Sequence, residues 1–183
     1  MQRTMKFNPI TRARRGLLVL AASLGLVLGI SAVPAQAAPI VHYASKVELR
    51  MKHSNQCLEV ADWSTANGAA VRQWPCTGGA NQQWYRVYLS DTPIDGYYYK
   101  NANSGKCLEI GGWGRNNGAT ANQWDCHFGL NQLFLTSTRL VTDPAYVWNK
   151  CLEIADWSTQ PGARARLWDC HGGANQSITM RLL

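Results

Sequence analysis

Three glutamates with matching sequence neighbours are the residues of this chain whose types and spacing are best suited to chemistry. Glu59, Glu109 and Glu153 each end a Cys-Leu-Glu triplet. Each is followed by a tryptophan two residues before a second cysteine, and then by an Asn-Gln pair. A carboxylate accepts charge-assisted hydrogen bonds, an indole offers a flat apolar face, and an amide both donates and accepts. Such sets suit the binding of a polar ligand, or hydrolysis where two carboxylates come close together.

The glutamates belong to an internal repeat, which must supply the elements that position them. In each copy the second cysteine follows the first by 19 residues. Each copy also holds a tryptophan six residues after its first cysteine, at Trp63, Trp113 and Trp157. The copies span approximately residues 45–90, 96–139 and 145–183. Among the fifteen possible pairings, the constant spacing favours one disulfide per copy: Cys57–Cys76, Cys107–Cys126 and Cys151–Cys170.

The first 37 residues have the organisation of a secretory signal peptide. Basic residues that include Arg14 and Arg15 precede an uncharged run over residues 16–33, and Ala35-Gln36-Ala37 offers a small-residue cleavage site. We predict cleavage after Ala37, which leaves residues 38–183 as one domain. A retained membrane anchor and twin-arginine export are the alternatives. Export would place all six cysteines in an oxidising compartment, where disulfides persist.

The charge balance changes once this leader is removed. The leader carries five of the 18 basic residues and no acidic residue, so the formal net charge falls from +7 to +2. A protein that binds nucleic acid or an anionic membrane is expected to keep a clustered basic face. The densest basic pair left is Arg164 with Arg166, which we interpret as a solvated strand edge. The sequence therefore predicts neither nucleic-acid binding nor membrane insertion.

The residue pattern within a copy predicts β structure. Val47, Leu49 and Met51 alternate with polar residues, and clusters such as Asn116-Asn117-Gly118 are typical of tight turns. The pattern indicates about four strands per copy and no helical periodicity after the leader. A propeller has units of this size but needs at least four blades. Three four-stranded units instead predict an all-β chain with a pseudo-threefold β-trefoil fold, in which closure removes exposed sheet edges.

The repeated motifs resemble the ricin B-type lectin repeat over the whole mature chain. The resemblance rests on Cys-Leu-Glu, on Trp-x-Cys, and on the Asn-Gln-x-Trp run from Asn81 to Trp84. The Gln-x-Trp signature is intact only in the first copy, because Phe134 and Ile178 replace its tryptophan in the other two. All three positions stay apolar. We therefore predict that Trp84, Phe134 and Ile178 pack in the centre of the trefoil.

The resemblance implies one sugar pocket in each repeat, built from the acidic residue, the tryptophan near the second cysteine and the asparagine of the Asn-Gln pair. The nine matching residues are Glu59, Trp74, Asn81, Glu109, Trp124, Asn131, Glu153, Trp168 and Asn175. A pyranose has hydroxyls for the carboxylate and the amide, and an apolar face for the indole. The family typically has aspartate where this chain has glutamate. Its galactose-type preference therefore does not carry over directly.

Two features of the implied pockets stay open at the level of sequence. Trp63 and its two equivalents either form part of a modified site or cover the turns of their repeats. The first repeat matches the family pattern best. The second repeat has Gly112 at the position of Asp62, which leaves its loop less constrained.

Histidines beside the cysteines do not indicate a metal site. His127 and His171 each follow the second cysteine of a repeat. Structural zinc sites need paired short cysteine spacings, which the sequence lacks. We therefore expect three disulfides with exposed histidines, and neither a metal ion nor a cofactor.

These observations together predict a secreted, lectin-like carbohydrate-binding protein with up to three shallow pockets. The expected ligands are glycans or polysaccharides, with galactose- or xylose-containing ones as candidates, and we expect a monomer. Catalysis is not expected, because threefold symmetry places the three glutamates in different lobes. The alternative is a trefoil that binds proteins, such as a secreted inhibitor or toxin accessory.

Overall fold

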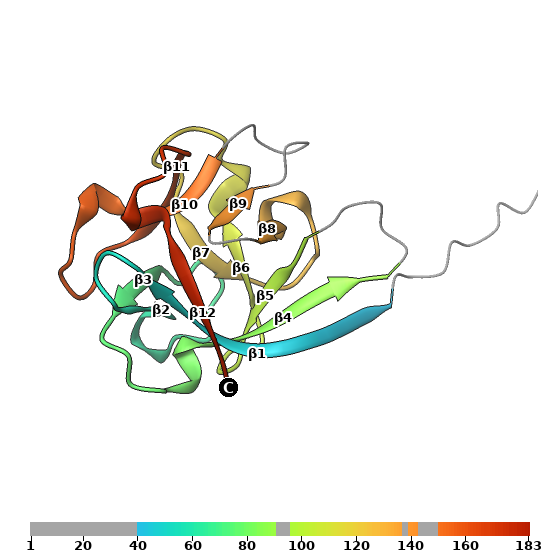
Figure 1. The fold of residues 1–183 in the computed structure, drawn as a ribbon. Coiled ribbons are helices and arrows are strands. Elements are labelled where there is room, and N and C mark those ends of the chain that lie inside the picture. The colour runs from blue at the N-terminus through green and yellow to red at the C-terminus, as the bar shows by residue number, and fades with distance from the viewer. Residues whose placement is uncertain (1–39, 91–95, 137–138, 143–149) are drawn as a thin grey trace, which may run out of the picture. The chain divides into compact units, whose positions relative to one another are not determined.

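The computed structural model describes residues 40–90, 96–136, 139–142 and 150–183. These residues form twelve β-strands, four in each repeat, joined by loops and by six short 3-10 turns (Figure 1). The predicted signal peptide over residues 1–37 lies outside the described residues, as do parts of the predicted boundaries between repeats. Both therefore stay predictions. Within the described residues there is no helix long and apolar enough to cross a membrane.

The strands occupy equivalent places in the three repeats. The first repeat holds β1 (Val41–Met51), β2 (Cys57–Val60), β3 (Val71–Trp74) and β4 (Gln83–Leu89). The second holds β5 (Tyr98–Asn101), β6 (Cys107–Ile110), β7 (Ala121–Trp124) and β8 (Phe134–Thr136). The third holds β9 (Leu140–Thr142), β10 (Lys150–Ile154), β11 (Ala165–Asp169) and β12 (Ile178–Leu182). The 3-10 turns after the second strands are η1 (Ala61–Trp63), η3 (Gly111–Trp113) and η5 (Ala155–Trp157), and those before the fourth strands are η2 (Ala80–Gln82), η4 (Leu130–Gln132) and η6 (Ala174–Gln176).

Two kinds of strand pairing build the fold. Hydrogen bonds connect β12, β1, β4 and β5 in succession, and β8 pairs with β9. A bridge between Tyr97 and Phe134 links the start of β5 to β8. The middle strands of the repeats instead form three hairpins, β2–β3, β6–β7 and β10–β11. This is the predicted β-trefoil, in which outer strands surround a shared core and each repeat adds one hairpin.

The hydrophobic core is shared by all three repeats. The three apolar side chains that alternate with polar ones along β1 are fully buried: Val47, Leu49 and Met51. The three equivalent positions predicted to pack centrally are at most 3% exposed: Trp84, Phe134 and Ile178. Trp84 Nε1 donates a hydrogen bond to the Leu58 carbonyl at 3.1 Å, which satisfies the polar group of this buried side chain. The prediction that Trp84, Phe134 and Ile178 pack centrally is confirmed.

The three predicted disulfides are present: Cys57–Cys76, Cys107–Cys126 and Cys151–Cys170. Each joins the start of a hairpin to the loop that follows it, since Cys57 lies opposite Trp74 in the β2–β3 pair. By the entropy of loop closure, a cross-link over a loop of this length adds about 3 kcal/mol to the free energy of unfolding. The base of each hairpin is therefore held closed.

Polar contacts join neighbouring repeats at their exposed rims. Asn67 of the first repeat donates to Asp125 Oδ2 of the second at 2.7 Å, and Lys106 binds the other oxygen of the same carboxylate. Asn117, Asp169 and Lys150 repeat this arrangement between the second and third repeats. At the remaining interface prolines replace the asparagine and the aspartate, and Gln56 Nε2 donates instead to the Thr159 carbonyl at 2.6 Å. The junctions are therefore alike in position but not in chemistry.

The contact between the first two repeats predicts a stability that declines in acid. Lys106, and then Asn67, hold the pKa of Asp125 below its usual range. The ionised carboxylate therefore stabilises the fold above that range, and the contribution is lost as the pH falls through the lowered pKa. Lys106→Met should lower the melting temperature at neutral pH and have a smaller effect in strong acid. Thermal unfolding followed by circular dichroism over a pH series measures this difference.

The matched control is Lys52→Met, which removes an exposed lysine outside these contacts. A loss of melting temperature that is equal in both variants, or independent of pH, would contradict the assigned role of Asp125.

Candidate functional site

The backbone after the second strand of each repeat lifts one tryptophan to the surface. Trp63, Trp113 and Trp157 have φ angles of 54–55°, and each follows a residue with a positive φ. The left-handed region costs a non-glycine residue roughly 1–2 kcal/mol. Such residues persist where the surrounding structure holds them, often at functional sites. The three indoles are 51–55% exposed.

A glycine in each repeat makes room for this tryptophan. A methyl group added at Gly129 would lie 2.8 Å from the Trp113 ring, closer than side chains approach one another. Gly79 has the same relation to Trp63, and Gly173 to Trp157. The indole therefore packs one part against glycine backbone and leaves the rest in solvent. Trp63 and Trp113 also line pockets, which favours the interpretation that they belong to the site.

The glutamate carboxylates lie at the bottom of the site and accept hydrogen bonds from the Asn-Gln pair. In the first repeat Asn81 Nδ2 and Gln82 Nε2 lie 3.2 and 3.1 Å from Glu59 Oε2. The corresponding distances are 3.4 and 3.2 Å in the second repeat, and 3.2 and 3.3 Å in the third. The three glutamates are only 2–4% exposed. The longer glutamate side chain thus carries its carboxylate to both amides.

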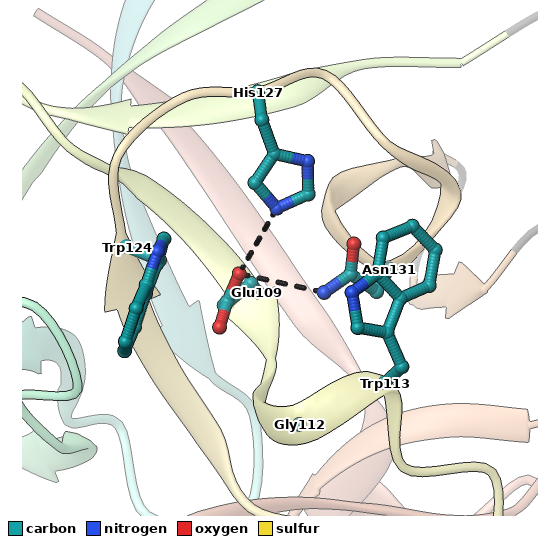
Figure 2. Close-up of a pocket in the computed structure, with 6 residues that line it drawn as sticks. All are labelled: Glu109, Gly112, Trp113, Trp124, His127 and Asn131. Atoms are coloured by element: carbon teal, nitrogen blue, oxygen red, sulfur yellow. Dashed lines mark hydrogen bonds and ion pairs between the residues drawn. The ribbon is translucent and has the colours of Figure 1, made fainter. Parts of the chain in front are cut away.

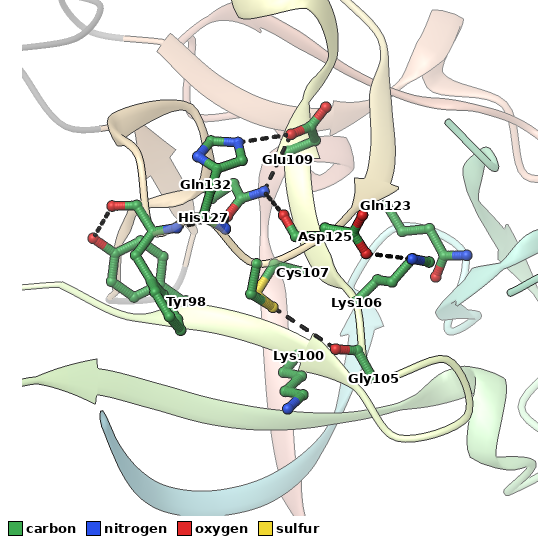
Figure 3. Close-up of a disulfide and its surroundings, with 12 residues drawn as sticks. Tyr98, Lys100, Gly105, Lys106, Cys107, Glu109, Gln123, Asp125, His127 and Gln132 are labelled. Carbon is green, nitrogen blue, oxygen red and sulfur yellow. Dashed lines mark hydrogen bonds and ion pairs between the residues drawn. A yellow bond between two sulfur atoms is a disulfide. The ribbon is translucent and has the colours of Figure 1, made fainter. Parts of the chain in front are cut away.

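The glutamine of each pair holds the loop that follows the hairpin through hydrogen bonds to its backbone. Gln132 Nε2 donates to the Asp125 carbonyl at 3.0 Å as well as to Glu109. Its Oε1 accepts from the backbone N–H groups of His127 and Phe128, both at 3.1 Å. Figure 3 shows this glutamine between Glu109 and the loop that carries His127. It is fully buried and positions the site without reaching solvent.

The asparagine of each pair keeps one unused acceptor. Asn81, Asn131 and Asn175 each donate from Nδ2 to the glutamate and to a backbone carbonyl. Their Oδ1 atoms are buried and have no hydrogen-bond partner among the described residues. A buried acceptor without a partner costs about 1–3 kcal/mol, so its recurrence in three repeats calls for a reason. These oxygens are not open to solvent, so a ligand hydroxyl reaches them only if the surrounding loop shifts.

These residues surround pockets in the first two repeats. The pocket of the second repeat encloses about 440 Å³ and is lined by Glu109, Gly112, Trp113, Trp124, His127 and Asn131 (Figure 2). That of the first repeat encloses about 230 Å³ and is lined by Glu59, Asp62, Trp63, Arg72, Trp74, Thr77 and Asn81. The structure thus brings the three predicted residues together in a pocket in each of the first two repeats. The larger pocket of the two lies in the second repeat, although the first matches the family pattern best.

In the first and third repeats an arginine completes the surroundings of the glutamate. Arg72 Nε donates to Glu59 Oε1 at 3.0 Å, and Arg166 Nε donates to Glu153 Oε1 at 2.9 Å. The interpretation of Arg166 as a solvated strand edge was wrong, because its side chain is only 21% exposed and forms this ion pair. Each arginine precedes the pocket tryptophan by two residues. Since side chains alternate along a strand, this spacing was the signal that could have placed them on one face.

The Arg72 guanidinium is shared between two carboxylates. Its terminal nitrogen lies 2.8 Å from Asp62 Oδ1, in addition to the bond from Nε to Glu59. Burial lowers the pKa of Arg72, but the hydrogen bonds to Glu59 and Asp62 outweigh this effect and the pKa lies above its usual value. The guanidinium therefore carries its positive charge at neutral pH.

The histidines contact the site in the second and third repeats. His127 Nε2 lies 3.4 Å from Glu109 Oε2, and His171 Nε2 lies 3.2 Å from Glu153 Oε2. Each imidazole also stacks on the neighbouring indole of Trp113 or Trp157, with ring centroids 5.7 Å apart. The prediction of exposed histidines is therefore incomplete, because both rings form one wall of their repeat's site. Nothing in the local spacing of His127 indicated its contact with Glu109.

A threefold trefoil with an acidic, amide- and indole-lined site in its repeats defines a ligand-binding domain of the lectin class. Comparison with family models matches residues 41–124 to the ricin-type beta-trefoil lectin domain-like family and residues 96–181 to the ricin-type beta-trefoil lectin domain. The two matches together span residues 41–181, and the chain belongs to the ricin-type β-trefoil lectin family. Domains of this family are, in general, carbohydrate-binding modules and usually lack catalytic activity.

Solved structures with the same fold include a designed protein and natural lectins. The designed threefold-symmetric protein ThreeFoil is 30% identical, with a TM-score of 0.67 over 75% of this chain and 99% of its own. The ricin B-like lectin of Macrolepiota procera, solved in complex with lactose, is 16% identical, with a TM-score of 0.58 over 76% of this chain and 97% of its own. At that identity the likeness shows the fold alone.

One curated protein matches a short stretch. Serine protease 1 of Rarobacter faecitabidus is 47% identical over 34 residues, which are 19% of this chain. The match covers only 6% of that protein's length. The similarity therefore concerns about one repeat and not the whole protease.

The buried glutamine predicts a large loss of stability on truncation. Gln132→Ala removes two donated hydrogen bonds and leaves two backbone N–H groups without their acceptor. We expect the free energy of unfolding to fall by about 3 kcal/mol, measured by urea denaturation. Gln83→Ala is the matched control, since that glutamine makes one solvent-exposed bond to the Gly78 carbonyl and should cost less than about 1 kcal/mol. Equal losses would show that Gln132 does not organise the site.

Proposed function

We propose that this chain is a secreted, lectin-like carbohydrate-binding protein with up to three shallow sugar pockets, one in each repeat. The observation that supports this most strongly is the recurrence of one arrangement. Every repeat has a buried glutamate, an asparagine with an unpartnered acceptor and at least one exposed indole. The pockets of the first two repeats collect these groups in one cavity.

The chemistry of this arrangement suits a pyranose ring. The carboxylate of Glu109 can accept hydrogen bonds from sugar hydroxyls through Oε1. The Trp124 indole, 43% exposed, offers a flat surface for the C–H face of the sugar. We propose glycans or polysaccharides as ligands, with galactose- or xylose-containing ones as the first candidates. Single sites of this kind bind weakly, and more than one site on a monomer would gain avidity on a polymer.

The same contacts support binding rather than hydrolysis. A glycoside hydrolase needs two carboxylates on either side of the scissile bond, one of them free to protonate or attack. The three glutamates lie in different repeats. Within the first repeat the guanidinium of Arg72 bridges Glu59 and Asp62, so both carboxylates are engaged in ion pairs and neither is free to protonate or attack a ligand. We therefore propose a binding protein without catalytic activity.

Glycan binding is tested on an array of mammalian and plant glycans and by pull-down with insoluble polysaccharides. We expect specific binding, and we expect Glu109→Gln and Trp124→Ala to weaken it at least about tenfold, because each removes a hydrogen-bond acceptor or a stacking surface. Matched controls are Glu48→Gln and Tyr88→Ala, which change a carboxylate and an exposed aromatic ring outside the pockets. Failure to bind any glycan would overturn the proposal. Capture of a protein that competing sugars do not release would favour the protein-binding alternative.

Export is tested separately by expressing the full chain in a bacterium and sequencing the N-terminus of the protein in the medium. We expect the mature chain to begin at Ala38, because the small-residue site ends at Ala37. A protein that stays in the membrane with its leader attached would contradict this part of the proposal.

A further inference from the structure

The three repeats share the same scaffold but differ in what fills the site. We infer that the second repeat holds the open site, which takes an uncharged pyranoside between Trp113 and Trp124. We also infer that Arg72 and Arg166 occupy the equivalent space in the first and third repeats. This inference rests on the proposed function, since it concerns which repeat binds a sugar.

The position that decides this difference lies opposite the glutamate in each hairpin. In the strand registers Glu59 faces Arg72, Glu153 faces Arg166, and Glu109 faces Asn122. The arginines are long enough to reach both the carboxylate and the pocket tryptophan, whereas an asparagine is not. At this position the side chain therefore fills the site in the first and third repeats, and in the second repeat it is too short to do so.

Each arginine uses the two groups that a sugar would need. Arg72 binds Glu59 Oε1 through Nε, and its guanidinium carbon lies 4.6 Å from the centroid of the Trp74 ring. In the third repeat Arg166 binds Glu153 Oε1 and lies 4.3 Å from the centroid of Trp168. A pyranose entering either site must displace a charge-assisted hydrogen bond and a cation–π contact. Asp62 and Asp156 hold the outer end of each guanidinium and oppose this displacement.

The second repeat lacks both the arginine and the aspartate that holds it. Gly112 replaces the aspartate, and the equivalent of Ala61 and Ala155 is Gly111, where a methyl group would clash with Asn122 Nδ2. Within the described part of the chain, every contact of the Glu109 carboxylate is made by Oε2. Its Oε1 is therefore available to a ligand, and the pocket around it is about 440 Å³ against about 230 Å³ in the first repeat.

The walls of this open pocket indicate the class of ligand. Figure 2 shows Trp124 and Trp113 on opposite sides of the Glu109 carboxylate, with His127 and Asn131 completing the rim. Two indoles suit a ring with apolar C–H groups, and the carboxylate suits adjacent hydroxyls. The negative charge of Glu109 disfavours uronic acids and sulfated sugars. The geometry therefore points to a neutral pyranoside.

Titration with lactose and, separately, with xylobiose tests the inference. The indole N–H signals of the pocket tryptophans are followed by nuclear magnetic resonance in the isotopically labelled wild-type protein. We expect the signals of Trp113 and Trp124 to saturate at sugar concentrations at least about tenfold lower than those of Trp74 and Trp168, because the latter sites must first release an arginine. Glucuronic acid should leave Trp113 and Trp124 unmoved at the concentration at which the neutral sugar saturates.

Two variants exchange the properties of the pockets. Gly111→Ala with Gly112→Asp and Asn122→Arg gives the second repeat the residues of the first, and binding should weaken about tenfold or more. Ala61→Gly with Asp62→Gly and Arg72→Asn makes the reverse change, and the Trp74 signal should then respond at the concentration that moves Trp124. The second variant tests the inference by a gain of binding, which unfolding cannot imitate.

The outcomes separate this inference from the proposed function. If Trp74 or Trp168 responds as readily as Trp124 in the wild type, or if the second variant gains nothing, the assignment of the arginines is overturned while sugar binding stands. If no indole responds to either sugar and the array is blank, sugar binding itself fails and the inference falls with it.

Discussion

The hydrogen bonds between a buried glutamate and an Asn-Gln pair are the interaction on which each repeat depends. They join the second strand of the repeat to the 3-10 turn that leads into its fourth strand, and so connect the hairpin to the barrel wall. A carboxylate so deeply buried is stable only because these donors satisfy it. The glutamine also fixes the following loop, while the asparagine leaves one oxygen unpaired. The scaffold and the candidate binding site are therefore built from the same three side chains.

Around this common base the walls of the site vary independently. The first repeat has an arginine and a threonine where the second has an asparagine and a histidine, and the third combines arginine with histidine. None of these exchanges touches the core or the disulfides. A repeat protein can change its sites one at a time in this way, because the residues that line each of the two pockets come from a single repeat. Threefold symmetry of the fold thus does not require threefold equivalence of binding.

The backbone strain at the exposed tryptophans is the same in all three repeats, whereas the central core position varies. Trp63, Trp113 and Trp157 keep an unfavourable backbone conformation in all three repeats, and each is matched by a glycine that admits its ring. The central core instead tolerates Trp84, Phe134 and Ile178 at one symmetric position. A hydrophobic interior accepts side chains of different shape when neighbours adjust. A ring that must stay half in solvent at a fixed angle has no such freedom, so the backbone there is repeated without change.

The sequence by itself determined the number of repeats, the trefoil, the three disulfides and the central residues. It also determined the glutamate, tryptophan and asparagine that line the pockets of the first two repeats. These features follow from the periodic spacing of residues, which is visible in the amino-acid sequence because every copy has the same local geometry. Only the tertiary structure decided that Arg166 is paired with Glu153, that His127 faces Glu109, and that the larger of the two pockets lies in the second repeat. Those outcomes depend on strand register and on the reach of single side chains across a hairpin. The sequence shows these differences only as substitutions, because the contacts that each side chain makes depend on its position and direction in the folded chain.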